Sequence, residues 1–190
     1  MKIISQNSIR SLRNLYFVRT VFQVIWAATV ITTAHTKPQL GAVLFILYPL
    51  WDVACTVYDL FTSSESGNAR TSQRVNALLG IMAAIGIGLT VFRQPLYAVA
   101  VFGAWAFGAG ALQLVAALIR RKQEFGSQWA MILSGAQSTV AGVAYFVGGL
   151  LDKRHIKDVG GYAIFGAVYF LVSGILLTRK LSKVSLVEAS

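Results

Sequence analysis

Six long apolar segments follow one another along the 190-residue chain, and they limit its fold more than any other feature. The hydrocarbon core of a bilayer is about 30 Å thick, so a helix needs about 20 apolar residues to cross it. Only 13% of the residues are charged and the mean hydropathy is +0.64, which is typical of a polytopic membrane protein. The sequence therefore predicts one all-α membrane domain over residues 1–190, with spans at 14–34, 39–61, 75–92, 96–118, 128–150 and 160–178.

Short polar stretches join these spans into three helical hairpins, at about 14–61, 75–118 and 128–178. Pro38 and Pro95 stand where the second helix of a hairpin begins. Proline is tolerated there because the N–H that it lacks would have no partner within the first turn. We therefore expect each of these prolines to mark the start of a returning helix.

Lysine and arginine are distributed unevenly between the two sides of this topology. With the N-terminus inside, twelve lie inside and five outside, and the positive-inside rule then places both termini in the cytoplasm. Arg19 interrupts the apolar core of a candidate signal peptide, so we expect the first helix to remain uncleaved. The inner set is Lys2, Arg10, Arg13, Arg19, Arg70, Arg74, Arg120, Arg121, Lys122, Arg179, Lys180 and Lys183, and the outer set is Lys37, Arg93, Lys153, Arg154 and Lys157.

The net charge of +10 raises the question of a nucleic-acid partner. The basic residues fall at the ends of the apolar runs, and no basic patch is interleaved with aromatic residues as single-strand binders require. We therefore expect the lipid bilayer, with its anionic headgroups, as the partner of these charges, and no nucleic acid.

Small residues recur at four-residue spacing in the second and third hairpins. Such stripes let helix backbones approach closely, which matters in lipid because apolar side chains gain little there by burial. The same faces permit a homo-oligomer. The stripe Gly80, Ala84 and Gly88 matches Ser134, Ser138 and Gly142 at an offset of 54, and Ala100, Gly103, Ala104, Phe107 and Ala111 match Ala163, Gly166, Ala167, Phe170 and Gly174 at an offset of 63. The two hairpins therefore look like copies of one unit.

The first hairpin largely lacks this stripe and carries charged residues within its spans. Arg19, Asp52 and Asp59 are expensive in hydrocarbon, so each requires a partner or a function. Counted from the turn near residue 36, Arg19 and Asp52 lie at the same depth, and so do Arg13 and Asp59. The simplest interpretation is two ion pairs, Arg19–Asp52 and Arg13–Asp59, that fix which helix faces which. Alternatively, Arg13 and Asp59 reach the headgroups.

A functional interpretation of the same residues is that Asp52 lines a polar cavity. Pro49 lies inside the second span, where it removes an N–H from the helix and leaves the carbonyl of Phe45 unpaired. A kink, a free carbonyl and an acid within two turns could bind a cation, a proton or a polar solute. The candidate intramembrane polar cluster is Arg19, Asp52, Asp59, Arg13, Pro49 and Gln23.

No sequence motif indicates enzyme chemistry. The chain has no HExxH and no phosphate-binding glycine loop, and its two carboxylates in the second span lack a third group to polarise a substrate. It has one cysteine, Cys55, and two histidines that are far apart in sequence. We therefore expect no catalytic residues, no cofactor and no metal site.

Four stretches carry a resemblance to a known family: "NALLGIMAAIGIGLTVF" at 76–92, "VFGAWAFGAGALQLVAALIRRK" at 101–122, "QWAMILSGAQSTVAGVAYFVGG" at 128–149 and "YAIFGAVYFLVSGILL" at 162–177. They resemble the HdeD-like short-repeat membrane proteins of bacteria, a family with a domain of unknown function. The resemblance implies a multi-pass protein of the bacterial cytoplasmic (inner) membrane. It implies stress response at most, because the name-giving member is linked to acid resistance. Arg19 and Asp52 depart from typical members, and no catalytic residue is carried over.

Two functions follow as expectations. The first is a non-enzymatic inner-membrane protein of the HdeD-like type, with a stress or acid-response role or a structural role through interaction. The alternative is a small transporter or channel for a proton, cation or polar solute that uses a polar pocket at Asp52.

Overall fold

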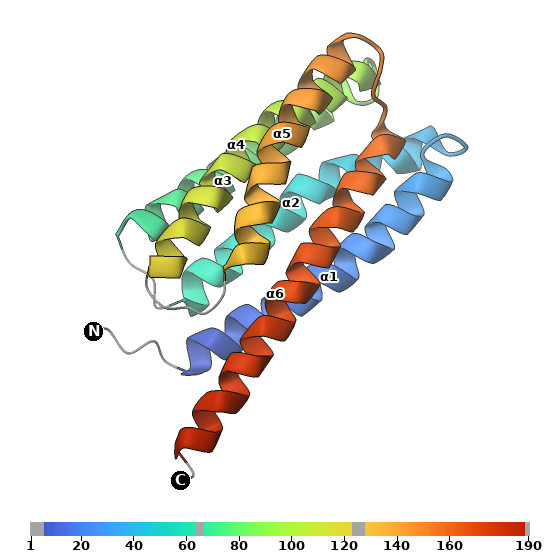
Figure 1. The fold of residues 1–190 in the computed structure, drawn as a ribbon. Helices are drawn as coiled ribbons and strands as arrows, with labels where there is room; N and C mark the ends of the chain where they lie inside the picture. Colours follow the sequence, from blue (N-terminus) through green and yellow to red (C-terminus); the bar gives the residue numbers. More distant parts are fainter. Residues whose placement is uncertain (1–5, 64–66, 123–127, 189–190) are drawn as a thin grey trace.

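The computed structural model describes residues 6–63, 67–122 and 128–188 as a bundle of long helices (Figure 1). Six of its helices are long and apolar enough to cross a membrane, and the described residues contain no strand. The predicted all-α, six-span architecture is confirmed. The elements are α1 (Gln6–Thr33), α2 (Pro38–Thr62), α3 (Asn68–Thr90), α4 (Pro95–Lys122), α5 (Trp129–Leu150), the short 3₁₀ helix η1 (Ile156–Asp158) and α6 (Val159–Glu188).

The helices extend beyond the predicted spans at the end of the bundle where the chain termini lie. α1 begins at Gln6 rather than at residue 14, α3 begins at Asn68 rather than at 75, and α6 continues to Glu188 rather than ending at 178. Hydropathy detects only the part of a helix inside hydrocarbon, whereas intrahelical hydrogen bonds allow the helix to continue into the headgroup region. Pro38 and Pro95 begin α2 and α4 as predicted. Lys2, which the charge count used, lies outside the described residues.

The six helices form a closed ring in chain order. Each helix packs against its predecessor and its successor, and α6 closes the ring by packing along α1. α1 and α6 lie side by side, and the described ends of the chain are at the end of the bundle opposite the α1–α2 turn (Figure 1). α4 and α5 form the most extensive helix pair, although they belong to different predicted hairpins. The three hairpins are therefore held together mainly by contacts between helices of different hairpins.

Large apolar side chains cover the outside of this ring. Phe61, Leu89 and Val140 are 84%, 75% and 72% exposed, and they lie on three different helices. Soluble proteins rarely expose large continuous apolar surfaces. The outer surface is therefore suited to contact with the lipid bilayer.

Glycines allow the backbones of α4 and α5 to touch. A Cβ atom added at Gly142 would lie 2.7 Å from the carbonyl oxygen of Gly103, and one added at Gly110 would lie 2.6 Å from the backbone nitrogen of Thr139. No side chain larger than hydrogen fits at these points without moving a backbone. The small-residue faces of α4 and α5 are thus used within the chain, and the homo-oligomer stays a prediction.

The small-residue stripes of the second and third hairpins face equivalent neighbouring helices in the ring. The α3 stripe faces the preceding helix, since a Cβ at Gly80 would lie 3.4 Å from the carbonyl oxygen of Pro49 in α2, and the α5 stripe likewise faces α4 through Gly142. The matching positions Gly103 in α4 and Gly166 in α6 face the next helix, α5 and α1 respectively. This arrangement agrees with two copies of one unit placed in succession around the ring.

Aromatic side chains fill the ring on the side of the hairpin turns. Phe102 is fully buried, and its ring centroid lies 5.5 Å from that of Tyr162 and 5.6 Å from that of Tyr145. Tyr48 and Trp105 extend this cluster toward the middle of the bundle. A second, smaller apolar cluster lies nearer the termini and contains Ile9, Leu12, Tyr16, Ala117, Met131, Phe170 and Leu177.

We predict that Gly142→Ala destabilises the protein by about 1–3 kcal/mol, because the added methyl group forces α4 and α5 apart. The free energy of unfolding, measured in detergent micelles, tests this. Gly161→Ala is the matched control, since a Cβ there meets nothing within 4 Å. It should be neutral or stabilise the protein by up to about 1 kcal/mol. Equal effects of the two substitutions would contradict the glycine-dependent contact.

Candidate functional site: a polar cavity inside the ring

A cavity of about 120 Å³ lies inside the ring, between the two apolar clusters. All six helices contribute to its wall. Its charged lining residues are Arg19, Asp52, Asp59 and Arg120, and its aromatic lining residues are Tyr16, Tyr48, Trp51, Trp105, Tyr162, Tyr169 and Phe170. Polar groups thus line a space in the part of the bundle that crosses the hydrocarbon.

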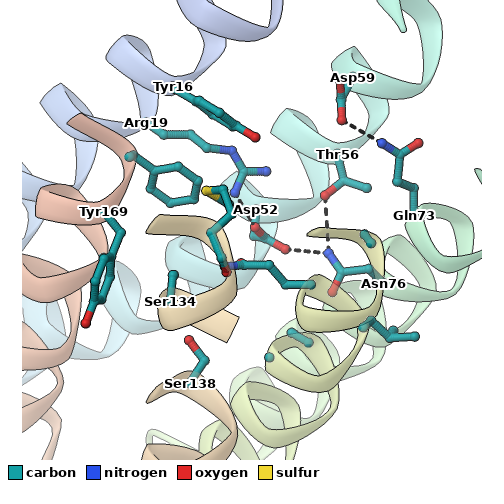
Figure 2. A pocket seen from close by; sticks show the side chains of 18 of the residues that line it. Tyr16, Arg19, Asp52, Thr56, Asp59, Gln73, Asn76, Ser134, Ser138 and Tyr169 are labelled. Atoms are coloured by element: carbon teal, nitrogen blue, oxygen red, sulfur yellow. Dashed lines mark hydrogen bonds and ion pairs between the residues drawn. The ribbon is translucent and has the colours of Figure 1, made fainter. Parts of the chain in front are cut away.

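The first polar network of the cavity centres on Asp52 in α2 (Figure 2). Arg19 in α1 donates from Nη1 to Asp52 Oδ1 at 2.8 Å, so the predicted Arg19–Asp52 pair is present. Asn76 in α3 donates from Nδ2 to Asp52 Oδ2 at 2.8 Å and to Thr56 Oγ1 at 3.2 Å. The guanidinium of Arg19 also lies 5.0 Å from the centroid of the Phe170 ring. Both oxygens of Asp52 are therefore engaged by the protein.

The second network centres on Asp59, two turns further along the same face of α2. Arg120 in α4 donates from Nη2 to Asp59 Oδ2 at 2.6 Å, and Gln73 in α3 donates from Nε2 to the same oxygen at 2.6 Å. Arg120 also donates to the hydroxyl of Tyr16 at 3.3 Å. This network joins α1, α2, α3 and α4 near their terminal-side ends.

The predicted Arg13–Asp59 pair is wrong. Arg13 is directed away from Asp59, and its guanidinium donates to the side-chain oxygen of the neighbouring Asn14 at 2.8 and 3.1 Å. Equal depth in a hairpin does not ensure that two side chains share a face. Asp59 is directed into the ring, where Arg120 from another hairpin reaches it.

Gln23 and Pro49, the remaining predicted members of the cluster, differ in position. Gln23 lines the cavity and donates from Nε2 to the hydroxyl of Tyr48 at 3.2 Å. Pro49 is fully buried inside α2 but is not part of the cavity wall. It faces Gly80 of α3 instead. The structure thus brings four of the six predicted residues to the cavity, and Arg13 and Pro49 lie outside it.

Several buried polar atoms of the cavity wall have no partner. Within the described residues, eight buried side-chain nitrogen or oxygen atoms lack a hydrogen bond, and six of the eight belong to cavity-lining residues. Such an atom costs about 1–3 kcal/mol, and native proteins contain few of them. The six are Arg19 Nε, Gln23 Oε1, Trp51 Nε1, Gln73 Oε1, Asn76 Oδ1 and Trp105 Nε1. Their concentration in residues that line one cavity makes this cavity the candidate functional site.

The charged groups of the cavity wall are engaged by one another and by neighbouring amides. No group of three or more His, Cys, Asp or Glu residues that could hold a metal ion occurs in the part of the chain that the structure describes. Cys55 is buried and does not line the cavity.

Sequence reasoning missed Arg120, Gln73, Trp51 and Trp105 as members of the site. Arg120 looked like an ordinary inner-loop charge because it precedes two more basic residues. The distance of Arg120 from the α3–α4 turn, which puts it near the depth of Asp59, is a signal that could have indicated it. Nothing in the sequence distinguishes an indole that faces a cavity from one that faces lipid.

We predict that Asp59→Asn destabilises the protein by about 3 kcal/mol, because it removes the carboxylate that is paired with the buried Arg120 guanidinium. The free energy of unfolding in detergent micelles measures the effect. Arg13→Gln should change it by less than about 0.5 kcal/mol, since that side chain is only half-buried and its hydrogen bonds to Asn14 are exposed. In the double variant Asp59→Asn/Arg120→Gln, part of the lost stability should return. A larger effect at Arg13 than at Asp59 would contradict this assignment of partners.

Comparison with known families adds an independent finding. Residues 75–147 match a family model described as a short repeat of unknown function (DUF308). No curated protein and no solved structure matches the chain. The matched region runs from α3 through α4 into α5, so it includes the glycine contact of α4 with α5 but none of the charges of α1 and α2. This part of the chain is therefore similar to the DUF308 short repeat.

Proposed function

We propose that this protein is a non-catalytic, multi-pass membrane protein that binds a small polar solute in the ring and lets it pass across the membrane. The six unpartnered polar atoms in cavity-lining residues are the observation that carries this proposal. In hydrocarbon such groups are retained only where they find partners or line a water-accessible path.

The position of the cavity supports the same function. Asp59 lies near the terminal-side end of α2, and Trp105 lies ten residues into α4 from the opposite end. The lining thus extends from one face of the membrane toward its middle, where the Tyr48, Phe102, Trp105, Tyr145 and Tyr162 cluster fills the ring. Transporters commonly place solute sites near the midplane with a closed layer on one side.

A structural role is the second candidate, and the two ion pairs favour it. Arg19–Asp52 ties α1 to α2, and Asp59–Arg120 ties α2 to α4. Pairs of this kind can specify which helices pack together. The resemblance to HdeD-like proteins adds a role in stress or acid response to this candidate. A helix-pairing role alone leaves the unpartnered indole N–H groups and amide oxygens without an explanation.

Solute passage is tested by reconstituting the protein into liposomes and following the permeation of small polar solutes by stopped-flow light scattering, with a pH-sensitive dye inside for protons. Ala109 lines the cavity, so Ala109→Leu should fill it and lower the permeation rate by about tenfold or more. Ala104→Leu, on an exposed face of the same helix, is the matched control and should leave the rate unchanged. If the protein raises the permeation of no solute or proton, the structural role remains.

We further propose that the protein lies in the bacterial inner membrane with both termini in the cytoplasm. The support is the uneven distribution of Lys and Arg, twelve against five. A fluorescent protein fused after residue 190 should then fluoresce, and alkaline phosphatase fused at the same point should be inactive. An active phosphatase fusion would place the C-terminus outside. It would reverse the side from which the Asp59 end of the cavity is reached.

A further inference from the structure

The unpartnered polar atoms of the cavity-lining residues are evenly divided between donors and acceptors. Arg19 Nε, Trp51 Nε1 and Trp105 Nε1 can only donate a hydrogen bond. The free side-chain oxygens of Gln23, Gln73 and Asn76 can only accept one. Gln23, Gln73 and Trp105 are 8%, 8% and 6% exposed, so bulk solvent does not reach them freely. A molecule that satisfies this wall must carry both kinds of group.

The charges of the cavity wall cancel. Its ionisable acidic and basic side chains are two arginines and two aspartates. Arg19 is paired with Asp52 at 2.8 Å, and Arg120 is paired with Asp59 at 2.6 Å. Asn76 and Gln73 take up further acceptor capacity of these carboxylates. A charged solute would therefore find no counter-charge to offset the loss of its hydration.

The size of the cavity sets a further limit. A volume of about 120 Å³ is somewhat less than that of an apolar cavity of about 150 Å³ that accommodates benzene in another protein. It therefore holds a solute of roughly four to six non-hydrogen atoms. Trp105 and Tyr162 also line the cavity, so aromatic side chains are part of its wall.

From these three observations we propose that the cavity binds a small uncharged solute with both hydrogen-bond donors and acceptors, such as a simple carboxamide. This inference rests on the proposed solute function and specifies its chemical class. Selectivity comes from the balance of the two ion pairs, and binding comes from the unpartnered indole N–H groups and amide oxygens. The intact Arg19–Asp52 pair therefore acts as a filter against ions and not as an ion-binding site.

Three isosteric probes test the proposed class: acetamide is neutral, acetate is an anion and acetamidinium is a cation. Each has one methyl signal, so saturation-transfer NMR on the full-length protein in nanodiscs of deuterated lipid can follow all three. We expect a saturable signal from acetamide and at least tenfold weaker binding of the two ions, an estimate from the cost of unpaired charge. The inference is overturned if acetamide gives no saturable signal, or if either ion binds as well as acetamide does.

Variants connect the signal to the cavity. Trp105→Phe removes one donor but keeps an aromatic ring, and it should weaken acetamide binding by about three- to tenfold. Trp129→Phe is the matched control, since Trp129 is 56% exposed and outside the cavity wall, and it should have no effect. Equal weakening by both substitutions would show that acetamide binds elsewhere, which would overturn the inference.

Charge-shifting variants test the filter directly. Asp52→Asn leaves Arg19 without its carboxylate and should shift the preference toward acetate, whereas Arg19→Gln should shift it toward acetamidinium. If a folded Asp52→Asn protein binds the three probes with the same order of affinity as the unaltered protein, the ion pair does not set selectivity. If neither charge variant folds, the Trp105 comparison and the three probes on the unaltered protein still decide the proposal.

The same experiments separate this inference from the proposed passage of solutes. Acetamide binding without any permeation into liposomes would refute passage and leave the ligand class intact. Permeation of acetate, acetamidinium or protons without that of acetamide would support passage and refute the ligand class.

Discussion

The rest of this structure depends on one constraint: polar groups inside the membrane must form their hydrogen bonds without bulk water. In hydrocarbon, a polar group that finds no partner within the protein has no solvent to replace it. Backbone groups meet this condition through six long helices. Threonine hydroxyls on the outside meet it by donating to their own helix, as Thr29 does to the carbonyl of Ile25, and the charged side chains of the cavity meet it by turning toward the inside of the ring. Asp52 shows the result, since its two oxygens accept from Arg19 of α1 and Asn76 of α3. The polar network and the ring are thus consequences of the same requirement.

The fold was largely predictable because hydropathy reports directly on the six spans. Pro38 and Pro95 also indicated correctly where α2 and α4 begin. The helix ends near the termini were not predictable to the same degree. Polar residues such as Gln73 belong to a helix, and the hydropathy of the sequence gives no reason to include them. The packing of α6 against α1, which closes the ring, was also not predictable, because hydropathy does not indicate which helices are neighbours.

Within the site, the ion pair inside one hairpin was predicted correctly, and the ion pair between residues far apart in the sequence was not. Arg19 and Asp52 face each other across one turn, so counting residues from that turn was sufficient. Asp59 and Arg120 are 61 residues apart and belong to different hairpins. Their contact depends on how α2, α3 and α4 follow one another around the ring, which a single hairpin does not determine. The unpartnered indole of Trp105 depends further on side-chain direction, for which the sequence carries no signal.

The first hairpin and the repeat region contribute different features to the cavity. The repeat region supplies close backbone contact, because Gly103 and Gly110 in α4 meet Gly142 and Thr139 in α5. Such contact holds a ring closed, but on its own it brings no charged group into the membrane. The charges come mainly from α1 and α2, which supply Arg19, Asp52 and Asp59 and lie outside the matched repeat. The repeat region therefore supplies the frame of small residues, and the first hairpin supplies most of the charges that line the cavity. For that reason the chemistry of the site has to be inferred from Asp52 and its partners, and not from the repeat that surrounds them.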